Sequence, residues 1–205
     1  MTIDTAPITL PRLDEDALAT LFTEARTANS FADTPVTDEE LERIWSLAKW
    51  APTAANTQPL RVLFVRPGEG RDRLVERMSE GNQAKTASAP AVAVLAVDSE
   101  FYEHIPHVFP IRPEMKDQLA ANPSGTEAMA RFNATLQIGY FILAVRAAGL
   151  AAGPMAGFDA EAVDKEFFPG GRLHSLLVVN IGHPGEQAWF NRLPRLEHED
   201  VISWA

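Results

Sequence analysis

Helical periodicity accounts for many of the apolar positions along this chain. Apolar side chains recur at intervals of three and four residues over 14–27 and again over 126–149, which predicts two helices, the second ending at Gly149. Ahead of a third apolar stripe, Thr37 and Glu40 form a capping-box sequence, in which Thr37 caps the helix and Glu40 reaches back. This sequence predicts a further helix that begins at Thr37.

Three shorter segments have the composition of β-strands. Residues 60–65 are rich in branched side chains and lie between prolines, and residues 91–97 and 176–181 are continuous apolar runs, as in strands buried on both faces. Shorter helices are predicted over 71–78 and after Asp159, a favourable N-cap residue. Because the helices are too long and irregular for repeated βαβ units, we predict an α+β fold in which helices cover a mixed central sheet.

Composition and charge narrow the range of functions. The chain has 205 residues, of which 46% are hydrophobic, and this is most simply one domain over 1–205. Its formal net charge of −10 repels phosphate backbones and anionic lipids, so we expect neither nucleic-acid nor membrane partners. With no cysteine, any redox chemistry needs an organic cofactor. The N-terminal residues lack the pattern of a secretory signal, so we expect a cytoplasmic protein.

Other well-known motifs are incomplete or missing. Residues 67–71 follow a strand and open a helix as a dinucleotide-binding loop does, but Arg73 stands where the third glycine is required. His104 and His107 could bind a metal, yet Pro106 between them should break the helix that would align two imidazoles. No Gly-x-Ser-x-Gly sequence marks a hydrolase nucleophile. We therefore predict neither a metal site nor a dinucleotide-binding loop.

Arginines beside polar residues offer candidate anion sites. Arg26, followed by Thr27 and Asn29, could grip a phosphate through charge-assisted hydrogen bonds. Arg26 could equally complement the dipole at the end of the preceding helix. Arg192 supplies a second local positive charge in otherwise acidic surroundings. A phosphate site built from both ends of the chain is one reading of this pattern.

Three further segments could lie against a flat ligand. Residues 50–59 place small and amide side chains between prolines, directly before a strand. Asn82 and Lys85 project from one helical face, a spacing that is also common on solvated surfaces. Residues 153–159 are rich in glycine and alanine, which leave backbone amides open to a planar ring.

Taken together and in this order, these segments resemble the FMN-dependent nitroreductase family, and the similarity runs from about residue 18 to residue 196. Residues 98–103, 153–159 and 192–196 more narrowly resemble the branch that contains malonic semialdehyde reductase of pyrimidine breakdown. The resemblance implies an FMN-dependent oxidoreductase that takes hydride from NADH or NADPH and passes it to a small electrophile.

The resemblance also assigns residues to the FMN phosphate. Arg26, Thr27 and Asn29 would meet the phosphate and the ribityl chain, and Arg192 would close on the phosphate from the C-terminal side. The sequence departs from the family pattern at Ala25, where an arginine is usual, and at Asn29, where a basic residue is usual.

The flavin ring would be held by the remaining segments. By the same resemblance, Asn82 and Lys85 would contact the pyrimidine edge, and the backbone amides of Ala156 and Gly157 would face N5. Lys85, Ala156 and Gly157 are thus the catalytic candidates, because fixed donors stabilise the charge of a reduced ring. The partner subunit would supply four residues: Pro52, Thr53, Ala54 and Asn56.

The resemblance further implies a homodimer with FMN at the interface. Residues 186–205 include Trp189, Phe190 and Trp204 and are too apolar for a free solvated tail. We expect this tail to wrap around the partner and add to its sheet, giving an intertwined dimer with C-terminal strand exchange. Residues 1–12 are expected to form an extended N-terminal arm.

The substrate stays open at this stage. Malonic semialdehyde, another aldehyde or enal, a quinone and a nitroarene all suit the resemblance, and no motif chooses between NADH and NADPH. A flavin-consuming or dehalogenating relative on the same fold is one alternative. A non-catalytic flavin-binding or dimeric scaffold protein is another.

Overall fold

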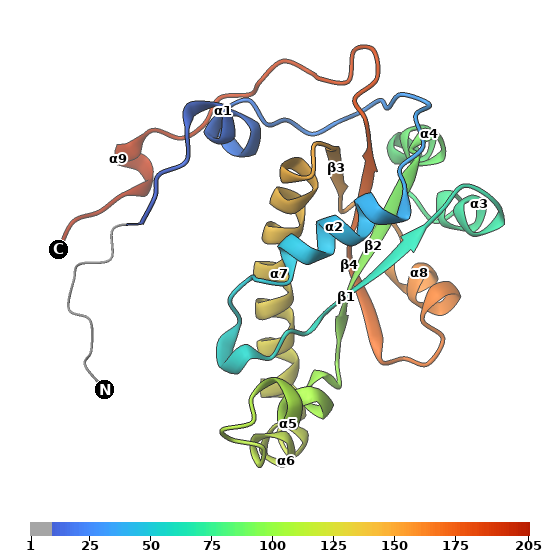
Figure 1. Ribbon diagram of the computed structural model, residues 1–205. Helices are drawn as coiled ribbons and strands as arrows, with labels where there is room; N and C mark the ends of the chain where they lie inside the picture. The colour runs from blue at the N-terminus through green and yellow to red at the C-terminus, as the bar shows by residue number, and fades with distance from the viewer. Residues whose placement is uncertain (1–9) are drawn as a thin grey trace.

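A four-stranded sheet with the order β1-β2-β4-β3 forms the centre of the computed structural model, which describes residues 10–205 (Figure 1). The strands are β1 (Leu60–Val65), β2 (Ala91–Asp98), β3 (Ala151–Met155) and β4 (Leu173–Gly182). All three neighbouring pairs are antiparallel, so the α+β class is confirmed but the predicted mixed sheet is wrong for the single chain. The long connections between strands allow either direction, so their lengths could not decide it.

Strand β3 is the one strand that the sequence pattern did not predict. Its sequence, Ala-Ala-Gly-Pro-Met, lacks the branched and aromatic residues that favour strands. It lies at the edge of the sheet, where a proline is tolerated, and its pairing with β4 gives it its extended form. The other three strands are confirmed, and all eight residues of β2 are buried, as its apolar run predicted.

Helices cover both faces of the sheet, so the body has three layers (Figure 1). Helices α2 (Asp38–Ala48) and α7 (Pro123–Ala147) pack on one face, against alternate strand residues such as Ala93 and Leu95. Helices α3 (Glu69–Val75) and α8 (Ala160–Phe167) supply Leu74 and Val163 to a second core on the other face, against the intervening position Val94. Helix α4 (Glu80–Ser88) lies beside α3.

Most predicted helix ends match the structure. Thr37 accepts from the Glu40 amide, and the Glu40 carboxylate accepts from the Thr37 amide, so the capping box is confirmed. Asp159 caps α8, and Gly149 lies just past α7 in the left-handed conformation. The helix predicted over 14–27 is too long: α1 (Glu15–Leu18) continues as the π-helical turn η1 (Ala19–Thr23) and stops, after which the chain runs extended beside β3.

Several short helical elements lie outside this framework, in the connections and in the C-terminal tail. They are η2 (Ala54–Asn56), η3 (Phe101–His104), α5 (Ile105–Val108), α6 (Met115–Ala120) and α9 (His198–Val201). Pro106 lies in the first turn of α5 and therefore starts a helix, where we expected it to break one. The predicted N-terminal arm over 1–12 lies mostly outside the described residues.

Helix α7 is long and apolar enough to cross a membrane, judged by length and composition only. It packs against α2 and the sheet, and it buries two amides: Asn133 accepts from the Ala54 amide before β1, and Gln137 accepts from the amide of Leu60, the first residue of β1. These contacts are those of a core helix.

A buried carboxylate ties three strands together at one end of the sheet. Asp98, at the end of β2, accepts from Arg61 of β1 at 2.7 Å and from Arg172, just before β4, at 2.7 and 2.8 Å. The Asp98 side chain is only 1% exposed. Burial by itself raises the pKa of Asp98, but the Arg172 hydrogen bond and the Arg61 charge outweigh it and hold that pKa below its ordinary value of 3.8.

We predict that this cluster stabilises the folded state at neutral pH and that its contribution is lost in acid. Because the pKa of Asp98 is lower in the folded chain, its contribution is complete above about pH 4 and is lost as the pH falls through the folded-state pKa. At neutral pH, Asp98→Asn should lower the free energy of unfolding by about 2 kcal/mol, less than for fully buried pairs because both arginines are partly exposed.

Urea unfolding between neutral and acid pH measures this effect. The difference between wild type and Asp98→Asn should shrink as the pH falls, whereas the exposed Asp117→Asn control should show little difference at any pH. A difference for Asp98→Asn that is constant with pH would contradict the role given to the ionised carboxylate.

Candidate functional site

The residues around Arg26 lie between two segments that are distant in sequence. The Ala28 amide donates to the Ala152 carbonyl of β3 at 2.9 Å, and the Asn29 amide donates to the Ala188 carbonyl at 3.0 Å. On the Ala152 side, a Cβ on Gly153 would lie 2.7 Å from the Ala28 carbonyl oxygen, so only glycine permits this approach. The N-terminal segment, β3 and the start of the C-terminal tail therefore form one unit.

This arrangement brings two predicted phosphate ligands to the same place. A guanidinium nitrogen of Arg192 lies 3.4 Å from the carbonyl oxygen of Ala25, the residue next to Arg26. The Arg26 guanidinium is partly exposed and lies 3.6 Å from the Glu24 carboxylate. The side-chain amide of Asn29 donates to the Thr27 carbonyl, which fixes the polar residues that follow Arg26. An arginine from the C-terminal tail thus reaches the backbone directly beside Arg26.

A second group of predicted residues meets where β3 ends. The side-chain amide of Asn82, on α4, donates to the Gly157 carbonyl at 2.8 Å, and the Ser79 amide donates to the same oxygen at 3.0 Å. A Cβ on Gly157 would lie 2.6 Å from Asn82 Nδ2. Lys85 lies on α4, three residues after Asn82, and is half-buried. Helix α4 is therefore held directly against the loop after β3.

The loop after β3 leaves two backbone donors available. Within the part of the chain that the structure describes, the N–H groups of Ala156 and Gly157 donate no hydrogen bond. Ala156 is exposed and Gly157 is half-buried, so an acceptor from outside the chain can reach them. Two adjacent free amides are a suitable partner for a polar atom on the edge of a ring.

The predicted residues between α2 and β1 lie elsewhere. In Figure 1 this segment runs beside the lower half of α7, whereas α4 and β3 lie at the upper end of the molecule. The Asn56 side-chain amide donates to the Val108 carbonyl of α5, and the Ala54 amide donates to Asn133 of α7. A single chain therefore does not bring Pro52, Thr53, Ala54 and Asn56 to the other predicted residues.

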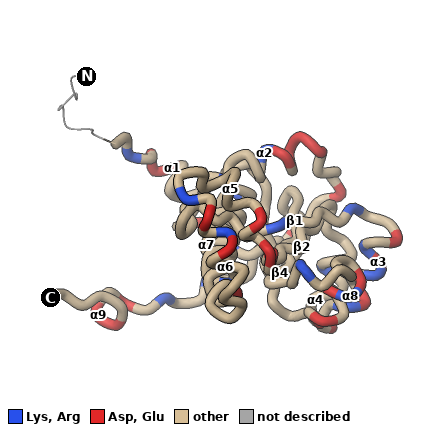
Figure 2. Tube along the Cα trace, turned by 90° about the horizontal axis from the view of Figure 1, so that it is seen from below, with Lys and Arg blue, Asp and Glu red and all other residues tan. Residues whose placement is uncertain are grey.

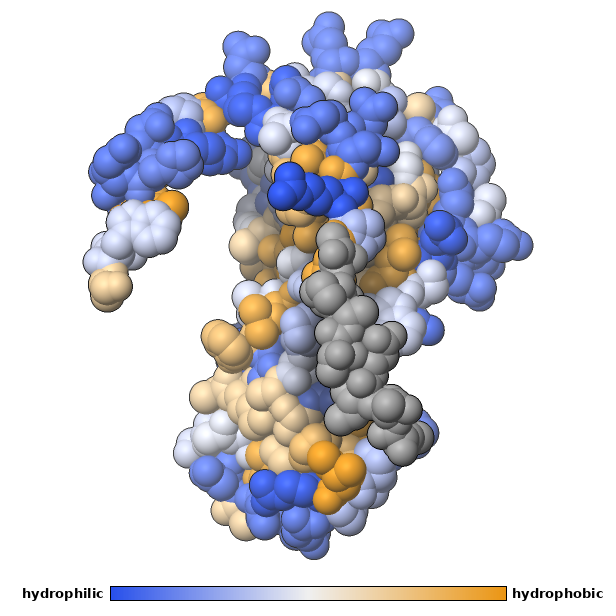
Figure 3. Space-filling view, turned by 60° about the vertical axis from the view of Figure 1, so that its left-hand side comes forward, coloured by the Kyte–Doolittle hydropathy of each residue, from blue (hydrophilic) through white to orange (hydrophobic). Residues whose placement is uncertain are grey.

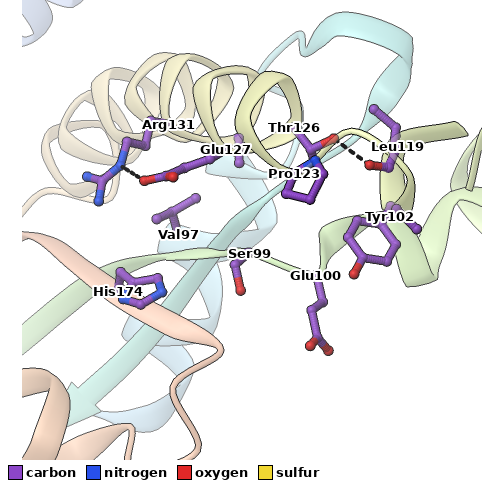
Figure 4. Close-up of a pocket in the computed structure, with 12 residues that line it drawn as sticks. Val97, Ser99, Glu100, Tyr102, Leu119, Pro123, Thr126, Glu127, Arg131 and His174 are labelled. Carbon is purple, nitrogen blue, oxygen red and sulfur yellow. Dashed lines mark hydrogen bonds and ion pairs between the residues drawn. The ribbon is translucent and has the colours of Figure 1, made fainter.

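A separate pocket of about 470 Å³ opens between the N-terminal end of α7 and the ends of β2 and β4 (Figure 4). His174, Ser99 and Tyr102 line it, and an ion pair between Glu127 and Arg131 lies at its edge. It contains none of the sequence-predicted ligand residues. Its volume alone gives no reason to assign it a ligand.

Sequence reasoning missed residues that act through the backbone. Ser79 and Gly153 fix the positions of Gly157 and Ala28, but a serine and a glycine carry little signal in a single sequence. Arg146 of α7 is half-buried and lines, with Arg26, a cavity of about 220 Å³. A single arginine within an apolar helix carries no signal in the sequence that it lies near the C-terminal tail.

Comparison with known proteins identifies the family of this chain. The model of the nitroreductase family matches residues 23–183. A Streptomyces coelicolor protein, provisionally named NADH dehydrogenase/NAD(P)H nitroreductase, is 62% identical over 196 residues, which cover 96% of this chain and 97% of that relative.

Solved structures show the same fold at lower identity. A Bacillus subtilis protein described as a nitroreductase superposes with a TM-score of 0.82 at 22% identity, covering 94% of this chain and 100% of that one. An Exiguobacterium sibiricum protein, described as a nitroreductase in complex with FMN, has a TM-score of 0.80 at 19% identity, covering 95% and 99%. Since the family model spans most of the sequence and the Streptomyces relative is similar over nearly its whole length, this chain belongs to the nitroreductase family.

Proposed function

We propose that the protein is an FMN-dependent NAD(P)H oxidoreductase that reduces a small electrophile, either malonic semialdehyde or a related aldehyde, or a nitro or quinone compound. The observation that carries this proposal is a pair of contacts: Arg192 reaches the Ala25 carbonyl, next to Arg26, and Asn82 reaches the Gly157 carbonyl just past the end of β3. The 62% identical relative is named for the same chemistry, as an NAD(P)H nitroreductase.

The residues present suit the phosphate end of FMN. Two guanidinium groups, Arg26 and Arg192, offer charge-assisted hydrogen bonds to a dianion, and the exposed Thr27 adds a hydroxyl donor. Ala25 and Asn29 replace the basic residues that are usual in the family, so this site has fewer positive charges than the family pattern. With fewer positive charges at the site, Arg192 contributes a larger share of the phosphate binding.

The residues at the end of β3 suit the ring of FMN. Bound FMN supplies a hydride carrier that NAD(P)H reduces and the electrophile oxidises. The half-buried Lys85 ammonium and the free amides of Ala156 and Gly157 stabilise the negative charge that reduction brings, and a preorganised donor of this kind contributes about 3 kcal/mol. No side-chain nucleophile is needed, and the two substrates use one site in turn, which gives ping-pong kinetics.

We propose an intertwined homodimer because large apolar surfaces of the single chain are exposed. Phe132, Leu136 and Tyr140 form a stripe on α7 and are 66%, 42% and 43% exposed. The C-terminal tail projects clear of the body, and apolar side chains gather on the face beside it (Figure 3). The tail extends from the body on the same side as α1, away from α3 and α8 (Figure 2). A second copy would cover these surfaces.

The sheet also offers a place for the partner's tail. Strand β1 is an edge strand: among residues 10–205 it pairs only with β2, so its outer backbone groups are available to a further strand. A groove of about 670 Å³, lined by Trp45 and Phe64 among others, runs between β1 and α2. The exposed aromatic residues Phe190 and Trp204 of residues 186–205 suit such a groove. The same exchange would bring 52–56 of one chain towards the FMN of the other.

A spectrum of the purified protein, followed by turnover with a panel of acceptors, tests this function. We expect a bound yellow flavin and oxidation of NADH or NADPH when an aldehyde, quinone or nitroarene is added. Turnover only with oxygen or a halogenated aromatic would favour the flavin-consuming or dehalogenating alternative. Bound FMN without turnover would favour a scaffold, and a colourless protein that does not bind FMN would reject the enzyme. Since the reductant is a cytoplasmic nucleotide, we place the reaction in the cytoplasm.

Gly157→Ala should weaken FMN binding by roughly tenfold, because the new methyl group displaces Asn82 and breaks its bond to the Gly157 carbonyl. Flavin fluorescence titration of the apoprotein measures the dissociation constant. Gly170→Ala is the matched control, since a Cβ there meets no atom within 4 Å. Equal affinities for the two variants would remove Gly157 from the site.

Arg192→Ala should weaken FMN binding by about 2 kcal/mol, or about 30-fold, because the phosphate loses a charged partner. Arg195→Ala is a control from the same tail, where the guanidinium turns back to the Leu193 and Pro194 carbonyls. Riboflavin, which lacks the phosphate, should bind wild type and Arg192→Ala equally. An unchanged FMN affinity for Arg192→Ala would refute this assignment.

A further inference from the structure

We propose that Asn133 is a positioning residue that shapes the loop between α2 and β1 for the flavin of the partner subunit. The inference rests on the proposed function, in which residues 52–56 of one chain reach the FMN of the other. It assigns a task to a buried residue of α7 that lies outside every segment from which the sequence predicted ligands.

The loop has an uncommon backbone that needs support. Ala55, Asn56 and Gln58 have φ angles of 50°, 52° and 47°, in the left-handed region that residues other than glycine rarely adopt. Each such residue is disfavoured relative to extended or helical backbone, and alanine and glutamine have no local compensation of the kind asparagine has. Three such residues within four positions persist only where surrounding contacts determine the conformation.

Asn133 supplies the contact at the start of this run. Its side chain is 1% exposed, and Oδ1 accepts from the Ala54 amide at 2.7 Å. Its Nδ2 donates to the Met129 carbonyl at 2.8 Å, one turn back on α7, so the side chain cannot rotate freely. The rigid core helix therefore fixes the backbone of Ala54, directly before the left-handed residues.

Other contacts hold the far end of the loop. The buried Gln137, one turn further along α7, accepts from the Leu60 amide at 3.0 Å. Arg61, itself paired with Asp98, donates to the Gln58 carbonyl at 2.9 Å. The Asn133 contact at Ala54 is thus the point at which α7 holds the start of the left-handed run, while the Val108 carbonyl of α5 holds the Asn56 side chain.

The shape of the loop matters for what it presents outward. Ala54 and Asn56 are exposed, and Thr53 is half-buried. The Thr53 hydroxyl accepts from the Gln58 amide at 3.2 Å, and Asn56 Oδ1 accepts from Gln58 Nε2 at 2.9 Å, so these side chains are already oriented before any ligand arrives. A loop ordered in advance binds without the entropy cost of ordering it. Losing the Asn133 contact should therefore appear as weaker FMN binding.

The first experiment measures the FMN dissociation constant of Asn133→Leu, which is similar in size but can neither accept from Ala54 nor donate to Met129. We expect affinity to fall by roughly tenfold, as for loss of one buried hydrogen bond. Thr126→Val is the matched control, because it removes another side-chain hydrogen bond of a buried α7 residue, one that goes to the Leu119 carbonyl of α6 and not to the loop. It should bind FMN as wild type does.

The second experiment separates positioning from a general loss of stability. Mixed dimers are prepared from differently tagged Asn133→Leu and Arg192→Ala chains. In the proposed dimer, one site then combines Arg192 of the Asn133→Leu chain with the intact loop of the other chain. The second site combines both defects. About half the sites should then bind FMN with wild-type affinity, whereas homodimers of either variant should have none. If Asn133→Leu merely destabilised its own chain, the phosphate ligands Arg26 and Arg192 of that chain would be impaired too. The mixed dimers would then have no site that binds FMN with wild-type affinity.

Each result has a defined meaning. If the wild-type protein does not bind FMN, the proposed function is overturned. If wild type and Asn133→Leu bind FMN with equal dissociation constants, only this inference is overturned. Mixed dimers with no tight sites also overturn it. Should Asn133→Leu not fold, Ala54→Pro removes the same amide at an exposed position that follows an extended residue, Thr53. Ala54→Pro homodimers should bind FMN more weakly than wild type. Mixed dimers of Ala54→Pro and Arg192→Ala chains should again have about half their sites at wild-type affinity. If either result is not obtained, the inference is overturned.

Discussion

The site depends on close backbone contact along β3. In the middle of this short edge strand, Gly153 lets the Ala28 carbonyl approach, and past its C-terminal end Gly157 meets the side chain of Asn82. A methyl group at either position would push the neighbouring segment away. These two contacts hold the segment with Arg26 and the helix with Lys85 against the same strand, so a phosphate and a ring joined by a short chain can be held at once.

The loop that we propose to complete the cofactor site lies away from β3. The loop with Thr53 and Asn56 is fixed to α7 and α5 at the opposite end of the molecule, and the single chain has no means of bringing it to β3. An exposed apolar stripe on α7, an exposed apolar tail and an unpaired strand edge are surfaces that a second copy would bury. Stability and cofactor binding would then depend on the same association.

The local parts of this architecture follow from local sequence. The capping box at Thr37, the N-cap at Asp159, the glycine after α7 and the apolar run of β2 each depend on residues within a few positions of one another, and each prediction is confirmed. The family was also predicted correctly, since the nitroreductase family model matches residues 23–183. The roles given to individual residues stay predictions.

What the sequence by itself determined is the α+β class, the position of most helices and three strands, and the segments that carry candidate ligands, because periodicity and capping are short-range. The tertiary structure alone decided the antiparallel order, the existence of β3 and the end of the first helix at Thr23, because those depend on pairing between distant residues. It also decided that Arg192 reaches Ala25 and that Asn133 holds Ala54. Hydrogen bonds that join residues far apart in a chain leave no periodic trace in a single sequence.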